Sequence, residues 1–310
     1  MPGREAGAEG GWREATFEGA PRFTEVRWAA LGLGAPFLAF DRLRNERVVI
    51  KEVSPGGNPE NLAHEFEALR RIAHRNVVRA QELLEGEDEL VLLLEHVEGV
   101  DFTSYVCVRG VETELSLEDT VPDVLVHLDR PAPRLRSPLD PGPPLDTDRL
   151  REALGQLAGA LREIHRLGIV HCDVKPQNIC VTPEGRVVLL DFGVSRLPGE
   201  SSADGEGTLV GTPNYMAPER LRGEPASPAN DLYAVGVILF EALTGRLPFM
   251  SESIMALLRR KLSDAPPIPS ELVPGVPADL NQLCVELLDR DPAKRPTADD
   301  VIRRLGVDIG

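Results

Sequence analysis

The sequence predicts an α+β fold in two unequal lobes: a small antiparallel β-sheet lobe with one helix, and a larger, mainly helical lobe. Strand-like runs dominate the first third of the chain, a single amphipathic helix interrupts them, and helical spacing dominates the remainder. The chain has 310 residues, of which 42% are hydrophobic, so each lobe can bury a core.

The first lobe is expected at residues 21–97, after a Gly-, Ala- and Glu-rich segment at 1–20 that we expect to be disordered. Short runs rich in β-branched and aromatic residues are separated here by turn-forming residues, which is the pattern of strands. One helix is expected at 59–74, where apolar residues recur at helical spacing. The strands are expected at 25–34, 36–43, 47–53, 77–85 and 89–97.

The second lobe is expected at residues 98–310 and contains several runs with helical periodicity. A proline-rich stretch at 109–145 interrupts it and cannot be helical throughout, because proline lacks the N–H that an interior helical turn requires. We interpret this stretch as an insertion, either a surface loop or a docking or regulatory element. Helices are expected at 149–168, 230–245, 253–262, 278–289 and 297–305.

Charge and cysteine content argue against several functions. The 34 Lys and Arg against 50 Asp and Glu residues give a net charge of −16, which disfavours nucleic acid and anionic membrane surfaces as partners. No apolar stretch is long enough to span a membrane, and the N-terminus lacks the features of a signal peptide. The four cysteines form no CxxC pair, which argues against a zinc or disulfide framework, so we expect a cytoplasmic protein.

The strongest chemical signal is the run HCDVKPQN at 171–178, followed by a DFG motif that begins at Asp191. Phosphoryl transfer from a nucleotide requires an oriented hydroxyl, fixed phosphates and neutralised charge, and little covalent chemistry from the protein. Asp173 can accept the proton of the attacking hydroxyl, and Lys175 can balance charge on the γ-phosphoryl group. Asn178 and Asp191 offer the oxygen ligands that Mg²⁺ prefers.

These motifs, in this order, resemble the eukaryotic-like serine/threonine protein kinase domain of bacteria. The resemblance covers most of the chain and implies the two-lobed protein kinase fold, with ATP and Mg²⁺ bound between the lobes. It assigns Lys51 to the α- and β-phosphates and Glu65 to an ion pair with that lysine. It also implies that adenine binds beside a gatekeeper at Leu94 and along a hinge that runs from Glu95 to Val97.

The same resemblance indicates the substrate class, and the sequence departs from the family pattern at one position of the catalytic loop. Lys175 and Thr212, the latter in GTPNYMAPE at 211–219, accompany serine or threonine specificity in the family. Cys172 stands where the family usually has an arginine that pairs with a phosphorylated activation-segment residue. We therefore expect activity without phosphorylation at Thr208. Further family matches are Asp231, which would brace the catalytic loop, and Arg295, which would pair with Glu219.

The phosphate-covering loop also departs from the family pattern G-x-G-x-x-G-x-V. Its four defining positions hold Gly32, Gly34, Phe37 and Ala39. The two glycines still permit close backbone approach to phosphate, whereas Phe37, after Pro36, is expected to stiffen the tip and to shield or obstruct the γ-phosphate. Val49 stands where the family usually has alanine. Ala39 and Val49 are thus either a volume-compensated exchange in the roof over adenine or independent drift.

We therefore expect an ATP- and Mg²⁺-dependent kinase that phosphorylates Ser or Thr of protein substrates, itself included. The alternative is a pseudokinase that serves as a nucleotide-binding scaffold, which the altered loop favours. A small-molecule phosphotransferase is a third candidate, against which the APE motif, Asp231 and Arg295 argue. The sequence around the hinge is similar to that of the kinase module of large bacterial signalling proteins. This similarity implies a regulatory partner or further C-terminal domains.

Overall fold

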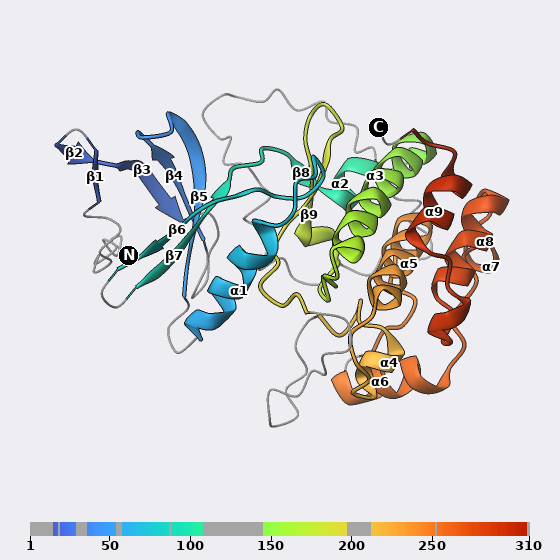
Figure 1. Ribbon diagram of the computed structural model, residues 1–310. Coiled ribbons are helices and arrows are strands. Elements are labelled where there is room, and N and C mark those ends of the chain that lie inside the picture. The colour runs from blue at the N-terminus through green and yellow to red at the C-terminus, as the bar shows by residue number, and fades with distance from the viewer. Residues whose placement is uncertain are drawn as a thin grey trace, which may run out of the picture.

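The sheet and most of the helices lie at opposite ends of the molecule, as the two-lobed prediction requires (Figure 1). The computed structural model describes residues 15–17, 19–28, 36–53, 58–86, 89–107, 145–196, 212–251 and 253–308. Among the sequence predictions, Gly32, Gly34, Thr208 and nearly all of the insertion at 109–145 lie outside these residues. The predicted disorder of 1–20 fails at its end, because Thr16–Phe17 (β1) and Ala20–Pro21 (β2) pair as a short antiparallel hairpin.

One antiparallel sheet builds the N-terminal lobe, with the strand order β3-β4-β5-β7-β6 among the described residues. Each of its strands falls on one of the five predicted runs, although the first begins earlier than predicted. Neighbours along the chain pair as hairpins except where β7 lies between β5 and β6. The strands are β3 (Phe23–Trp28), β4 (Phe37–Asp41), β5 (Glu46–Glu52), β6 (Ala80–Glu85) and β7 (Leu90–Glu95).

Helix α1 (Pro59–Leu69) packs against β6 and β7 and starts where the sequence predicts. The Asn58 side chain caps it by accepting a hydrogen bond from the backbone N–H of Glu60. The helix ends five residues before the predicted limit of 74, because backbone bonds of Arg70, Arg71 and Ile72 close a tight final turn. Its buried side includes Glu65, a carboxylate among apolar residues.

The two faces of the sheet belong to two separate apolar clusters. Successive strand residues point to opposite faces, so neighbours in sequence join different clusters. Leu38, Val49 and Leu94 belong to the main core, which continues into the helical lobe. The outer face of the sheet carries a smaller cluster of Phe23, Phe37, Ala39, Val48, Ile50, Val91 and Leu93.

Helices α3 (Thr147–Arg166) and α5 (Pro228–Thr244) form the centre of the C-terminal lobe (Figure 1). Asn230 to Leu243 of α5 are all buried, and a Cβ added at Gly236 would approach Leu287 of α8 to 2.8 Å. That close approach explains a glycine inside a helix. The remaining helices are α2 (Phe102–Val106), α4 (Pro218–Leu221), α6 (Ile254–Ser263), α7 (Pro269–Leu272), α8 (Ala278–Leu287) and α9 (Ala298–Leu305).

Three short strands lie between the lobes, in the antiparallel order β10-β9-β8. They present the loops before β9 and after β10, which contain the predicted catalytic motifs. Cys107 and Leu145 pair in an isolated bridge, so the chain leaves and re-enters the fold at adjoining points around the predicted insertion. The elements are β8 (Val100–Asp101), β9 (Ile179–Val181), β10 (Val187–Leu189) and the 3₁₀ helices η3 (Pro176–Asn178) and η4 (Pro292–Lys294).

Candidate active site

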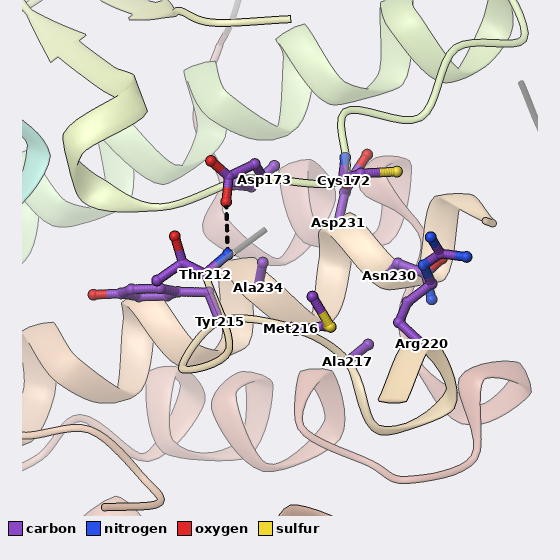
Figure 2. Close-up of a pocket in the computed structure, with 11 residues that line it drawn as sticks. Cys172, Asp173, Thr212, Tyr215, Met216, Ala217, Arg220, Asn230, Asp231 and Ala234 are labelled. Carbon is purple, nitrogen blue, oxygen red and sulfur yellow. Dashed lines mark hydrogen bonds between the residues drawn. The ribbon is translucent and has the colours of Figure 1, made fainter. Parts of the chain in front are cut away.

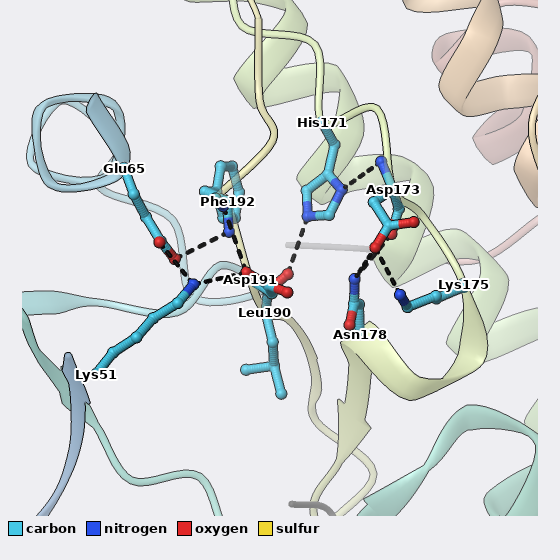
Figure 3. A network of polar contacts seen from close by, with 10 residues as sticks. Lys51, Glu65, His171, Asp173, Lys175, Asn178, Leu190, Asp191 and Phe192 are labelled. Carbon is cyan, nitrogen blue, oxygen red and sulfur yellow. Dashed lines mark hydrogen bonds and ion pairs between the residues drawn. The ribbon is translucent and has the colours of Figure 1, made fainter. Parts of the chain in front are cut away.

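Three charged side chains from three separate elements meet at one point (Figure 3). The ammonium of Lys51 on β5 lies 2.6 Å from Glu65 Oε2 on α1 and 2.8 Å from Asp191 Oδ1 after β10. The other Glu65 oxygen accepts the backbone N–H of Phe192 at 3.2 Å. A Cβ at Gly193 would come within 3.3 Å of both Asp191 Oδ1 and Lys51 Nζ, so any larger residue would crowd these two side chains. The predicted Lys51–Glu65 ion pair is present.

The charges of this group depend on one another. Burial alone would lower the pKa of Lys51, but the charges of Asp191 and Glu65 outweigh it and raise that pKa. The Lys51 charge in turn lowers the pKa of Asp191, whereas burial raises the pKa of Glu65. The lysine therefore stays protonated and Asp191 stays ionised. This leaves a fixed cation and a carboxylate side by side, as phosphate and metal binding require.

A second network surrounds Asp173 in the loop before β9 (Figure 3). Its Oδ2 accepts hydrogen bonds from Lys175 Nζ at 2.6 Å and from Asn178 Nδ2 at 3.0 Å. Its Oδ1 accepts the backbone N–H of Thr212 at 3.1 Å. Lys175 Nζ also donates to Thr212 Oγ1 at 3.0 Å. The predicted catalytic pair is thus assembled, and Thr212 contacts both of its members.

The predicted metal ligands come from neighbouring segments. Leu190, which precedes Asp191, donates its backbone N–H to the Asn178 carbonyl at 2.8 Å and so ties the two loops together. The Asn178 amide nitrogen is bonded to Asp173, which turns its amide oxygen away from that carboxylate. Carboxylate and amide oxygens suit Mg²⁺. The residues present therefore fit the predicted cation.

Asp231 of α5 holds the catalytic loop in an unusual backbone conformation. Its two carboxylate oxygens accept the backbone N–H groups of His171 and Cys172, each at 2.9 Å, and Oδ2 also contacts His165 Nε2 at 2.8 Å. Although burial opposes it, these partners hold the pKa of Asp231 below its usual value. Cys172 has a φ of 67° and Asp191 one of 56°, both in the left-handed region that side chains rarely adopt.

His171 and Cys172 themselves have structural roles. His171 is fully buried, contacts the Leu190 carbonyl at 2.9 Å and packs edge-on against Phe192. Burial raises the pKa of the Cys172 and Cys180 thiols to about 12, so both are neutral at physiological pH. A neutral thiol at position 172 offers no charge to a phosphorylated residue.

The predicted adenine region is only partly assembled as expected. Val49, Leu94 and Val97 belong to the main core. Ala39 does not, since it lies opposite Val48 and packs in the outer cluster. Leu38 is the cross-strand partner of Val49 and shares its face. The compensated exchange of Ala39 and Val49 is therefore wrong, because the alternation of side chains places these two residues on opposite faces of the sheet.

The expectation for Phe37 is also wrong. Phe37 is 3% exposed and packs in the outer cluster, on the face opposite to Leu38 and Val49. A side chain buried there cannot cover a phosphate on the other face of the sheet.

At the predicted hinge, two hydrogen bonds join Glu95 to Arg79. The Glu95 N–H donates to the Arg79 carbonyl at 3.0 Å, and Glu95 Oε1 accepts the Arg79 N–H at 3.0 Å, so strand β7 is held through its last residue.

The segment 212–220 lies against the catalytic loop and encloses a small cavity (Figure 2). Its volume is about 20 Å³, room for a single water molecule. Buried Glu219 at its far end forms a two-pronged ion pair with Arg295, with nitrogen–oxygen distances of 2.6 and 2.8 Å. The predicted Glu219–Arg295 pair is thus present and braces the segment. The cavity is lined by Cys172, Asp173, Val174, Thr212, Tyr215, Met216, Ala217, Arg220, Asn230, Asp231 and Ala234.

Sequence reasoning missed three contributors to this site. Leu38 was detectable, since strand alternation from Lys51 and Val49 across the hairpin selects it rather than Ala39. His165 gave no signal, because its contact with Asp231 spans 66 positions. Lys261 also gave no signal in the sequence, because a lysine late in an amphipathic helix is expected to be exposed. In the structure it is 1% exposed.

The fold and the two polar networks together are those of a protein kinase domain. The protein kinase domain model matches residues 32–305, and the chain belongs to this family. This confirms the predicted two-lobed kinase fold and the bacterial eukaryotic-like family. No helix in the described part of the chain combines the length and the apolar character that crossing a membrane demands.

Similar proteins are bacterial kinases. The probable serine/threonine-protein kinase PknB of Lactococcus lactis is 28% identical over 230 residues, which cover 74% of this chain and 31% of the relative. Serine/threonine-protein kinase PknD of Mycobacterium tuberculosis is 40% identical over 162 residues, or 52% of this chain and 24% of the relative. Serine/threonine-protein kinase PrkC of Bacillus subtilis is 26% identical over 276 residues, or 87% and 38%. The chain thus spans well under half the length of these relatives.

Proposed function

We propose that this domain transfers the γ-phosphoryl group of ATP to serine or threonine hydroxyls of protein substrates. The observation that carries the proposal is the joint assembly of two networks. Lys51, Glu65 and Asp191 form one, and Asp173 with Lys175 and Asn178 forms the other. The protein kinase family requires both a lysine–glutamate pair and a correctly placed DFG aspartate for turnover.

The chain's own residues supply positioning and charge. Lys51, fixed between two carboxylates, would contact the nucleotide phosphates. Asn178 and Asp191 would hold Mg²⁺, which neutralises phosphate charge when bound. Asp173 would orient the substrate hydroxyl and accept its proton, while Lys175, 2.6 Å from Asp173, would offset charge on the transferred group.

The contact between Lys175 and Thr212 supports serine or threonine as the acceptor. The ammonium donates to the threonine hydroxyl at 3.0 Å and to Asp173 at 2.6 Å, so it closes the space beside the base. A short aliphatic hydroxyl reaches a base in such a confined position, whereas the longer tyrosine side chain would need the acceptor backbone to lie farther away.

The scaffold alternative loses its main support. One of the residues that favoured it, Phe37, packs on the outer face of the sheet. The small-molecule alternative is disfavoured by the buried Glu219–Arg295 pair, which holds the segment 212–220 as a platform beside Asp173.

We further propose that the substrates are cytoplasmic proteins, this domain included. The greater length of the relatives suggests a regulatory partner or additional domains.

Transfer of labelled γ-phosphate tests the function. The protein is incubated with Mg·ATP, alone and with a basic generic protein substrate, beside the variants Asp173→Asn and Asp191→Asn. We expect label on serine or threonine, reduced about 100-fold or more in both variants, as loss of a catalytic base or a metal ligand predicts. Saturable Mg·ATP binding by the wild type without transferred label would instead establish the scaffold.

A further inference from the structure

Lys261, near the end of α6, is a buried lysine that no catalytic motif includes. It is 1% exposed. Its ammonium donates to the backbone carbonyls of Pro213 and Asn214, at 2.8 and 2.7 Å. These carbonyls belong to the segment that contacts Asp173, so a helix distant from the nucleotide site is joined to the catalytic loop.

The two carbonyls are the central ones of a tight turn. The backbone N–H of Tyr215 donates to the Thr212 carbonyl at 3.0 Å and closes the turn, with Pro213 in its favoured second position. The central carbonyls of such a turn have no partner within it and take one from elsewhere in the protein or from water. Lys261 supplies that partner to both.

The electrostatic surroundings show that Lys261 is not there for an ion pair. Among the described residues no carboxylate lies within ion-pair distance of its ammonium, and nearby Glu219 is already bonded to Arg295. The ammonium lies 5.3 Å from the centre of the Tyr233 ring, which Arg295 approaches to 4.9 Å. A lysine buried without a carboxylate is costly, and the turn carbonyls and the ring are its compensation.

The same turn is fixed at both of its ends. Its first residue, Thr212, donates its N–H to Asp173 (Figure 2). It also accepts a hydrogen bond from Lys175. Its last residue, Tyr215, donates its hydroxyl to Glu241 of α5 at 2.7 Å. Lys261 holds the middle, so a shift of the turn away from α6 would move Thr212 relative to the catalytic aspartate.

We propose that Lys261 is a positioning residue for phosphoryl transfer, which fixes the Thr212–Tyr215 turn against α6 and thereby holds Thr212 against Asp173 and Lys175. The inference rests on the proposed kinase function. It holds in either protonation state of Lys261, because a neutral amine still has two N–H groups for the two carbonyls.

The test compares Lys261→Met, which keeps the apolar stem without a donor, with Lys261→Gln, which keeps an N–H donor on a shorter side chain. Exposed Lys294→Met is the matched control. For Lys261→Met we expect kcat with a protein substrate to fall about 10- to 100-fold, as a small misplacement of a catalytic contact predicts, with the KM for ATP within about twofold. Lys261→Gln should fall between the wild type and Lys261→Met.

Amide hydrogen exchange gives a readout independent of turnover. The N–H groups of Thr212 and Tyr215 should exchange faster in Lys261→Met than in the wild type or Lys294→Met. A lower melting temperature with unchanged exchange at the turn and unchanged kcat per folded molecule would overturn the proposal. If Lys261→Met does not fold, Lys261→Gln decides by the same two measurements. A wild type without transferase activity would refute the kinase function, while the exchange measurement would still decide the role of Lys261 in the turn.

Discussion

Lys51 and Glu65 form an ion pair with a nitrogen–oxygen distance of 2.6 Å, although they lie on a strand and a helix that pack from different sides of the site. The glutamate side chain is 1% exposed and that of the lysine 25%. The pair therefore orients the lysine, whose ammonium also contacts Asp191 at 2.8 Å. This arrangement leads to the first prediction.

Glu65→Gln removes one of the two charges that orient Lys51. We expect kcat/KM for ATP to fall about 10- to 100-fold, because the ammonium then has only Asp191 to hold it against solvent. Glu67→Gln, on the exposed side of the same helix and paired with Arg70, is the control and should retain wild-type kinetics. Equal effects of the two substitutions would argue against the role of Glu65. Steady-state kinetics in ATP measure the difference.

Thr212 links the base to the lysine beside it. Thr212→Ala removes the hydroxyl that accepts from Lys175 but keeps the backbone N–H that binds Asp173. We expect kcat to fall about 10-fold, the loss of roughly one hydrogen bond to a charged group. Thr212→Ser keeps the hydroxyl and should restore most of the rate. If serine is no better than alanine, the hydroxyl contact does not contribute to turnover.

Leu38 and Val49 are cross-strand partners in the β4–β5 hairpin, whereas Ala39 and Val49 lie on opposite faces of the sheet. A double-mutant cycle of Leu38→Ala with Val49→Ala, measured by Mg·ATP binding, should show an interaction energy of about 0.5 kcal/mol or more. The cycle of Ala39→Val with Val49→Ala should be additive within about 0.5 kcal/mol, because the two side chains point to opposite faces. Coupling in the second cycle only would contradict the register.

The Glu219–Arg295 pair stabilises the C-terminal lobe from within. Its side chains are 3% and 0% exposed, and Arg295 also donates to the carbonyls of Ala229 and Asp289. Arg295→Met should lower the free energy of unfolding by about 3–5 kcal/mol, because it leaves the buried Glu219 carboxylate without its charged partner. Urea denaturation measures this. Arg303→Met, which breaks an exposed pair with Asp300 on α9, is the control and should change stability by less than about 1 kcal/mol.

Burial lowers the pKa of Lys261 to about 7, despite the nearby charge of Glu219. The unfolded chain, with an ordinary lysine, binds more protons between about pH 7 and pH 10, so this group makes the folded state more stable as pH rises through that range. Lys261→Met abolishes the effect. The difference in unfolding free energy between wild type and variant should therefore change by about 1.4 kcal/mol per pH unit there, in favour of the wild type.

The measurement is urea denaturation of both proteins at a series of pH values. The other polar side chains near Lys261, among them Tyr233 and the Glu219–Arg295 pair, are present in both proteins, so their contributions largely cancel in the difference. A pH-independent offset is also expected, since the variant leaves two turn carbonyls without their donor. A difference that stays flat across the range would show that Lys261 is not desolvated in solution.

Much of the site could be predicted because its residues act through short, ordered motifs. Asp173, Lys175 and Asn178 lie within six positions, and local chain geometry brings them together in the loop before β9. Lys51 and Glu65 were assigned through the resemblance to the kinase family, while alternation and periodicity in the sequence predict the strand and the helix that contain them. The assignment of Ala39 to the adenine site is wrong because Leu38, not Ala39, lies opposite Val49, and the order of residues in a motif does not specify the face of the strand.

The sequence alone thus determined the two-lobed fold, the strands and long helices, and the chemical groups of the site, because these depend on local periodicity and on residue type. Only the tertiary structure decided which side chains share a face and which distant groups meet. The sheet register placed Leu38 rather than Ala39 beside Val49, and the packing of α6 under a turn buried Lys261 against two carbonyls. Such contacts depend on the relative placement of whole elements, which no local pattern encodes.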